Sequence, residues 1–205
     1  MTRAASWSSR ADAPEEPGPA DRAAVAALLG RRPASPYTVA VRCPHGRPAV
    51  IRNAPVDRAG RPFPTRDWLV CRVLAAAVSR LESAGGVRRL EGDPQMREAL
   101  AAAQARHAVL HGGHAVAGAG DPRHVKCLHA HLAFALGGGD EAIAGWILDR
   151  AGAAHPDRCC LDTPAADGQL AAQATANWPS SERGPCGQLA VEATANWPSS
   201  EPGSG

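Results

Sequence analysis

The stretch from residue 124 to residue 134 carries the densest group of chemically active side chains in this sequence. It reads HVKCLHAHLAF and holds one thiol, Cys127, together with the imidazoles of His124, His129 and His131. Thiolate sulfur and imidazole nitrogen are donors that Zn²⁺ prefers in proteins, and a thiolate is also a nucleophile. These residue types therefore point to a metal site or to a reactive thiol.

The helical spacing of these side chains narrows the choice of ligands. On a helix, Cys127 and His131 stand four residues apart on one face, whereas His129 lies at the other edge of the apolar face. One helix rarely completes a tetrahedral site, so we expect further ligands from Cys43 and Cys71. The sequence thus predicts a Zn²⁺-type site made of Cys43, Cys71, Cys127 and His131, with His129 as the alternative nitrogen ligand.

Two other interpretations of these side chains stay open. The cysteines can be unreactive packing residues with the histidines at a helix edge, or one cysteine can be a reactive thiol without a metal. We expect His107, His111 and His114 to lie at a solvated helix end, because two glycines follow His111. The neighbouring pair Cys159 and Cys160 is interpreted as incidental.

Composition and charge exclude several classes of protein. The 205 residues carry a formal net charge of +2, which gives no strong signal for nucleic acid or for an anionic membrane. The N-terminus lacks the apolar run of a secretory signal, and no stretch approaches the roughly 18 apolar residues of a membrane span. We therefore expect a cytoplasmic protein whose six cysteines stay reduced.

The pattern of apolar residues predicts an α+β fold. Alternating β-rich segments at residues 37–43 and 49–52 form a hairpin, and residues 68–71 form a third strand or the entry into a helix. Helical periodicity and capping signals mark residues 21–29, 72–84, 94–111, 122–136 and 140–151. We expect a small antiparallel β element over about residues 37–71, packed against four or five helices.

The ends of the chain differ in composition from its middle. Residues 1–19 mix Ala, Ser, Pro and Glu without a period and are predicted to be a disordered leader. Residues 20–152 form the single expected globular domain. Residues 153–205 are a low-complexity tail, in which the unit at 168–186 recurs as 187–205. Two copies are too few for a solenoid, which needs about three stacked repeats.

Three separated motifs give the sequence a family resemblance. They are RCPHGRP at residues 42–48, PFPT at 62–65 followed by Cys71, and VKCLH at 125–129. In this order, over roughly residues 21–150, the sequence resembles DUF501, a bacterial family of uncharacterised proteins. The resemblance implies a histidine seven residues after the motif cysteine, where this chain has Phe134. It also implies a link to cell division, because relatives tend to be encoded beside a septum-formation initiator.

Two functional hypotheses follow from these observations. The first is a cytosolic protein that binds Zn²⁺ or another transition metal through the Cys and His residues named above. The second is a non-enzymatic module of the division or envelope machinery that binds a protein partner. The chain has no Gly-rich phosphate loop, no G-x-S-x-G elbow and no H-E-x-x-H motif, so the sequence assigns it no enzymatic reaction.

Overall fold

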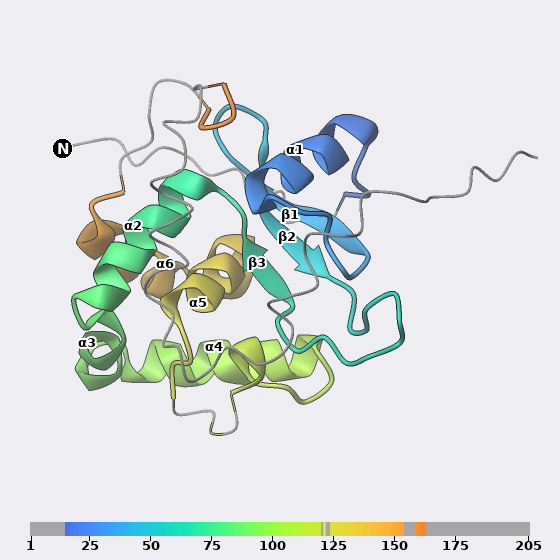
Figure 1. The fold of residues 1–205 in the computed structure, drawn as a ribbon. Coiled ribbons are helices and arrows are strands. Elements are labelled where there is room, and N and C mark those ends of the chain that lie inside the picture. The colour runs from blue at the N-terminus through green and yellow to red at the C-terminus, as the bar shows by residue number, and fades with distance from the viewer. Residues whose placement is uncertain (1–14, 120, 122–123, 154–158, 163–205) are drawn as a thin grey trace, which may run out of the picture. The chain divides into compact units, whose positions relative to one another are not determined.

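A three-stranded antiparallel sheet forms the centre of the fold (Figure 1). The computed structural model describes residues 15–119, 121, 124–153 and 159–162. The strands are β1 (Tyr37–Arg42), β2 (Pro48–Asn53) and β3 (Asp67–Leu69), and β2 lies between the other two. The predicted hairpin is confirmed, and residues 67–69 form a strand. Most of the predicted leader and of the predicted tail lies outside the described residues, so both stay predictions.

Six α-helices accompany the sheet in the described part of the chain, which confirms the α+β prediction. They are α1 (Pro19–Leu29), α2 (Arg72–Ser83), α3 (Gly86–Gly92), α4 (Arg97–Leu110), α5 (Leu128–Phe134) and α6 (Glu141–Ala151). A short 3₁₀ turn, η1, spans Val116–Gly118, and a wide helical turn, η2, spans Ala135–Gly139. None of the described helices has the length and the apolar character needed to cross a membrane.

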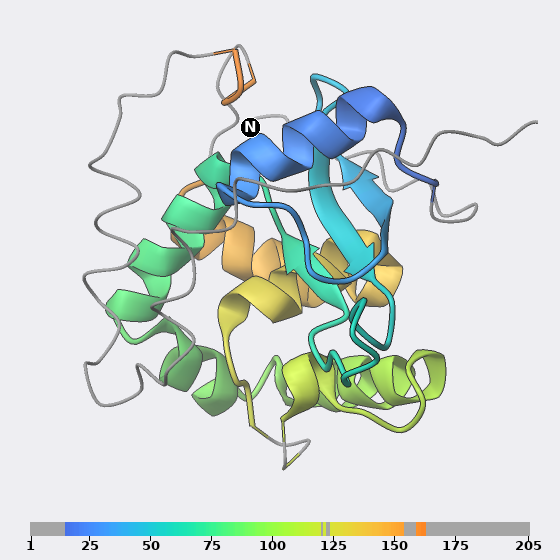
Figure 2. The same ribbon diagram turned by 45° about the vertical axis from the view of Figure 1, so that its right-hand side comes forward.

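The sheet is covered on both faces by apolar side chains. Ile51 of β2 packs with Val25 and Leu28 of α1 in one cluster, whereas its neighbour Val50 belongs to a larger cluster that includes α2, α5 and α6. Successive residues of a strand point to opposite faces, which explains why Val50 and Ile51 enter different clusters. Figures 1 and 2 show α1 against β2, and α5 beside β3.

The start of α5 differs from the sequence-based expectation. Asp121 and a following proline suggested a helix from residue 122, but α5 begins only at Leu128, after Cys127 in an extended conformation. Carboxylates from other helices bind the free N–H groups here: Leu128 N donates to Glu82 at 2.5 Å, and Val125 N donates to Glu91 at 2.8 Å. These acceptors come from distant parts of the sequence and satisfy the free N–H groups at the start of the helix, and so they set where α5 begins.

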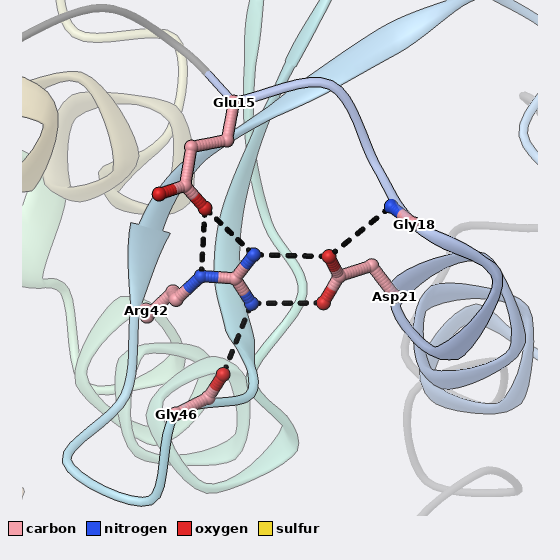
Figure 3. Close-up of polar contacts among 5 residues, drawn as sticks. All are labelled: Glu15, Gly18, Asp21, Arg42 and Gly46. Atoms are coloured by element: carbon pink, nitrogen blue, oxygen red, sulfur yellow. Dashed lines mark hydrogen bonds and ion pairs between the residues drawn. The ribbon is translucent and has the colours of Figure 1, made fainter.

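Arg42 fastens helix α1 and the segment before it to the sheet (Figure 3). Its guanidinium donates to both carboxylate oxygens of Asp21 at 2.8 and 2.9 Å, and to Glu15 at 2.8 and 3.1 Å. It also donates to the carbonyl of Gly46 in the β1–β2 turn at 3.0 Å. Gly46 adopts a φ of 76°, which favours glycine. The arginine of the RCPHGRP motif therefore joins α1, the turn and the segment at Glu15.

We expect Arg42→Met to lower the free energy of unfolding by roughly 1–2 kcal/mol, because several charge-assisted bonds are lost at a partly exposed site. Arg42→Lys should recover only part, since lysine cannot form the two-pronged contact. The hydrogen bond from Arg42 holds the pKa of Asp21 below its usual range. The contribution of Asp21 should thus be present above its unfolded pKa and be lost as the pH falls through the lower folded pKa.

Urea denaturation at several pH values measures this effect. Arg89→Met on the exposed side of α3 is the matched control, and it should leave stability within about 0.5 kcal/mol of the parent protein. An equal loss for both variants would contradict the role assigned to Arg42.

Candidate metal centre

Two histidines extend the buried face of helix α4. Its buried residues Leu100, Ala103, Gln104 and His107 follow helical spacing, and His111 at its end continues the same stripe. His107 is 1% exposed and His111 is 7% exposed. The expectation of a solvated helix end is therefore wrong for His107 and His111, whose imidazoles are buried. It is right for His114, which is exposed after the two glycines.

Asp67, the first residue of β3, points a carboxylate toward these histidines. It pairs in register with Arg52 of β2, whose Nε donates to Asp67 Oδ1 at 2.8 Å. Asp67 is only 3% exposed. Burial by itself raises the pKa of this carboxyl, but the His111 imidazole and the Arg52 guanidinium outweigh burial and hold the pKa below its usual range. Asp67 is therefore an ionised carboxylate inside the protein.

Asp67, His107 and His111 each offer one ligand atom, and these three atoms lie within 4.8 Å of one another. Asp67 Oδ2 and His111 Nε2 are 3.6 Å apart, and neither atom has a hydrogen-bond partner. Two ligand atoms about 2.1 Å from a Zn²⁺ ion at a tetrahedral angle lie about 3.4 Å apart. The observed spacing is thus close to that of two ligands of one metal ion.

His107 is held in the tautomer that a metal ligand requires. Its Nδ1 lies 2.7 Å from the carbonyl oxygen of His114, which only accepts hydrogen bonds, so Nδ1 carries the proton. Burial lowers the pKa of His107, which keeps the ring neutral and leaves a lone pair on Nε2. A ligating histidine commonly donates its other nitrogen to such a carbonyl. The group can therefore hold a metal ion with two imidazoles and one carboxylate.

The structure does not bring the five ligands predicted from the sequence into one group. Cys43 and Cys71 are buried, and Cys71 contacts Cys160. Cys127 precedes α5, where burial raises the pKa of its thiol. Among the described residues, none of these cysteines belongs to a set of three metal-binding side chains with ligand atoms within 4.8 Å. Their ligation of a common metal stays a prediction.

His131 lies near the candidate centre. It is 1% exposed, and neither ring nitrogen has a hydrogen-bond partner. Burial, together with the charge of the nearby His107, lowers the pKa of His131 to about 4. A buried polar group without a partner costs about 1–3 kcal/mol, so its retention calls for an explanation.

His129 uses both of its nitrogen atoms in contacts with α2. Nδ1 lies 3.1 Å from Glu82 Oε1, and Nε2 lies 3.1 Å from the Ala75 carbonyl and 3.2 Å from Ser79 Oγ. Ser79, His129 and Glu82 have the order of a catalytic triad, but Nε2 donates a hydrogen bond to the Ala75 carbonyl. His129 is thus a donor at Nε2 and cannot act there as the base for Ser79.

Phe134 occupies the place beside the two histidines of α4. Its ring centre lies 4.9 Å from that of His107 and 6.4 Å from that of His111, and both pairs meet edge to face. The family resemblance implies a histidine at this position. A histidine there would stand next to the candidate ligands.

The contacts of His129 give a testable pH dependence. Burial by itself lowers the pKa of His129, but the hydrogen bond and the charge of Glu82 outweigh it and raise the pKa above the usual 6.5. Glu82→Gln keeps an acceptor for Leu128 but removes the charge. We expect the His129 pKa to fall below 6.5 in this variant, as measured by NMR titration of the histidine ring protons.

The contact between His129 and Glu82 also makes the stability of the fold depend on pH. Protonated His129 stabilises the fold fully below pH 6.5, and this contribution is lost as the pH rises through its raised folded pKa. Glu98→Gln, at an exposed position on α4, is the control and should leave the His129 titration unchanged. A His129 pKa that is equal in both variants would rule out the pairing with Glu82.

Comparison with known proteins finds one family that matches part of the chain. Residues 39–111 match the family described as "Protein of unknown function (DUF501)". No curated protein and no solved structure is significantly similar to the chain. The matched segment runs from β1 to the end of α4, so it contains Asp67, His107 and His111. The match confirms the resemblance to DUF501 over residues 39–111, which include the motifs at 42–48 and 62–65, whereas the motif at 125–129 lies outside the matched segment.

Proposed function

We propose that this protein binds one divalent transition-metal ion, with Zn²⁺ as the first candidate, through Asp67, His107 and His111. The observation that carries the proposal is the pair of buried atoms Asp67 Oδ2 and His111 Nε2, which face each other at 3.6 Å without hydrogen-bond partners. A shared cation satisfies both atoms at once. Without it, neither the buried carboxylate oxygen nor the buried imidazole nitrogen has a hydrogen-bond partner.

The donor types favour a transition metal over Mg²⁺ or Ca²⁺. Imidazole nitrogen suits Zn²⁺, Cu²⁺, Fe²⁺ and Ni²⁺, whereas Mg²⁺ and Ca²⁺ prefer oxygen ligands. Two histidines and one carboxylate are a known ligand set for Zn²⁺ and for non-haem Fe²⁺. Three protein ligands leave a coordination position for water, whose pKa a bound Zn²⁺ lowers to about 7.

We assign His131 an outer role in this centre. It is buried and interacts electrostatically with His107, its ring stays neutral at physiological pH, and its nitrogens have no hydrogen-bond partner. A neutral imidazole can accept a hydrogen bond from a water molecule bound to the metal. The histidine predicted from the sequence as a ligand is thus proposed as a residue that orients the water.

Metal content and affinity test the proposal directly. Protein purified without chelators should contain about one equivalent of Zn²⁺ or another divalent transition metal by elemental analysis. His107→Ala and His111→Ala should each weaken binding by at least about 100-fold in competition with a chromophoric chelator, since each removes a direct ligand. His131→Ala should weaken binding by only about tenfold, as expected for an outer residue.

The control lies beside the same helix end. His114→Ala removes an exposed imidazole but keeps the main-chain carbonyl that orients His107, so metal content should not change. Metal content that survives both ligand variants but is lost in Cys43→Ser or Cys71→Ser would favour the set predicted from the sequence instead. Absence of metal from all preparations, with no binding of added Zn²⁺, would contradict the proposal. The second hypothesis, a non-enzymatic module that binds a protein partner, would then be favoured.

Phe134→His should improve the centre by offering a further imidazole next to His107. In the metal-free protein we expect a lower unfolding temperature, because a buried imidazole without a partner costs about 1–3 kcal/mol. Added Zn²⁺ should reverse this loss and bind more tightly than in the parent protein, because the new ring can join the ligands.

Calorimetric unfolding with and without Zn²⁺ measures both effects. Phe134→Leu is the control, since it also removes the aromatic ring but adds no ligand. If both variants bind Zn²⁺ with equal affinity, the position of Phe134 beside the centre is not one from which a ligand can reach the metal.

A further inference from the structure

The three ligands of the candidate metal centre are buried, so a metal ion needs a path to reach them. The side chains of Asp67 and His111 are 1% and 5% exposed, and His107 is 1% exposed. The Phe134 ring packs against both imidazoles, and Arg52 occupies one oxygen of Asp67. A working metal site requires an entry path as well as ligands. Some part of the protein must therefore move before an ion can bind.

An irregular segment at residues 112–119 touches the centre. After α4 the chain turns back and runs along the same helix (Figures 1 and 2). The carbonyl of His114 accepts the hydrogen bond from His107 Nδ1 at 2.7 Å. Gly118 lies against Pro64 in the loop before β3, because a Cβ atom on this glycine would come within 2.8 Å of the Pro64 side chain. The segment thus reaches from the helix that carries both histidines to the loop that leads into the strand of the carboxylate.

Gln104 of α4 holds both ends of this connection. Its side-chain oxygen accepts a hydrogen bond from Val116 N at 2.8 Å, and its side-chain nitrogen donates to the His124 carbonyl at 3.4 Å. Gln104 is 4% exposed and lies on the same buried face of α4 as the two histidines. Lys126 adds a further bond, from Nζ to the Ala117 carbonyl at 3.3 Å. These polar contacts can be exchanged for contacts with water when the segment moves.

The backbone of segment 112–119 favours movement. Ala117 adopts a φ of 58° and a ψ of 19°, in the left-handed region where a residue with a Cβ atom is strained. Gly112 and Gly113 at one end and Gly118 near the other can adopt many backbone conformations, so they can serve as hinges. The apolar side chains that the segment buries are small, namely two alanines and one valine. Opening therefore relieves strain and exposes little apolar surface.

The other elements around the ligands are held more firmly. Strand β3 is paired with β2 over residues 67–69, and α4 is a helix of 14 residues. All residues of α5 except His129 are buried. Displacing any of these elements would break several backbone hydrogen bonds or expose part of the core, whereas local openings in proteins occur where such contacts are few.

We propose that segment 112–119 is a gate for the candidate metal centre, which opens to admit a divalent transition-metal ion and is held shut by Gln104. This gate rests on the metal-binding function proposed above and describes how that binding is controlled. In the closed state the His114 carbonyl keeps the proton of His107 on Nδ1. The segment that admits the ion thus also prepares one of its ligands.

Hydrogen exchange of the metal-free protein tests the gate without any metal. The Val116 amide, which donates to Gln104, should exchange through a local opening that depends little on low concentrations of urea. The amide of Val78, a fully buried residue in the middle of α2, should exchange only through global unfolding and should depend strongly on urea. An equal urea dependence for the two amides would overturn the gate, because the segment would then open only when the whole protein unfolds.

The kinetics of Zn²⁺ exchange test the role of Gln104. Gln104→Leu removes both side-chain hydrogen bonds and should raise the rates of Zn²⁺ uptake and release by at least about tenfold each, because the closed state loses its bonds with or without the ion. The affinity should change by less than about threefold, since the three ligands stay in place. Stopped-flow mixing with a chromophoric chelator measures both rates, and circular dichroism checks that the variant is folded.

Gln95→Leu, at an exposed position just before α4, is the matched control and should leave both rates unchanged. Uptake and release rates in Gln104→Leu that equal those of the parent protein would contradict the assigned role of Gln104. Failure of the parent protein to bind Zn²⁺ would contradict the proposed function itself. Zn²⁺ binding together with a Val116 amide that exchanges only by global unfolding would instead reject the gate alone.

Discussion

The buried charge of Asp67 is the constraint on which the candidate centre depends. An ionised carboxylate removed from water is tolerated only with partners of opposite charge or with hydrogen-bond donors. Pairing of β3 with β2 brings Arg52 to one oxygen, and the end of α4 brings His111 toward the other. A shift of one residue in this register would turn Asp67 to the opposite face of the sheet. The register of three short strands therefore sets the chemistry of the site.

Partly buried carboxylates also bind backbone N–H groups at and before the start of helix α5. Glu82 accepts a hydrogen bond from the backbone N–H of the first residue of α5, and Glu91 accepts one from a residue ahead of that helix. Glu82 also contacts His129. Periodicity correctly predicted α2, because its buried residues repeat at helical spacing within one segment. It failed at the start of α5, because the groups that cap this helix come from α2 and α3. Local patterns contain no information about such distant acceptors.

The candidate centre was only partly visible in the sequence for a similar reason. His107 and His111 continue the spacing of Leu100, Ala103 and Gln104, and this continuation was the signal that both imidazoles face the core. The two glycines after His111 indicate a solvated helix end, and this local signal conflicts with the spacing. Asp67 had no signal at all, because one aspartate before a short strand looks like any turn residue. Only the strand pairing shows that its carboxylate meets helix α4.

Strand β3 leads from the candidate centre toward the buried thiol of Cys71 and keeps that thiol away from the centre. Asp67 opens the strand, and Cys71 follows it just before α2. Four residues of extended chain span about 13 Å, so the carboxylate and the thiol cannot share one metal ion. The strand is hydrogen-bonded to β2 along its length, and Cys71 N also donates to the Ala49 carbonyl of β2 at 3.2 Å. The buried Cys71 thiol is thus fixed to the same sheet that positions Asp67, but it lies beyond the reach of the candidate centre.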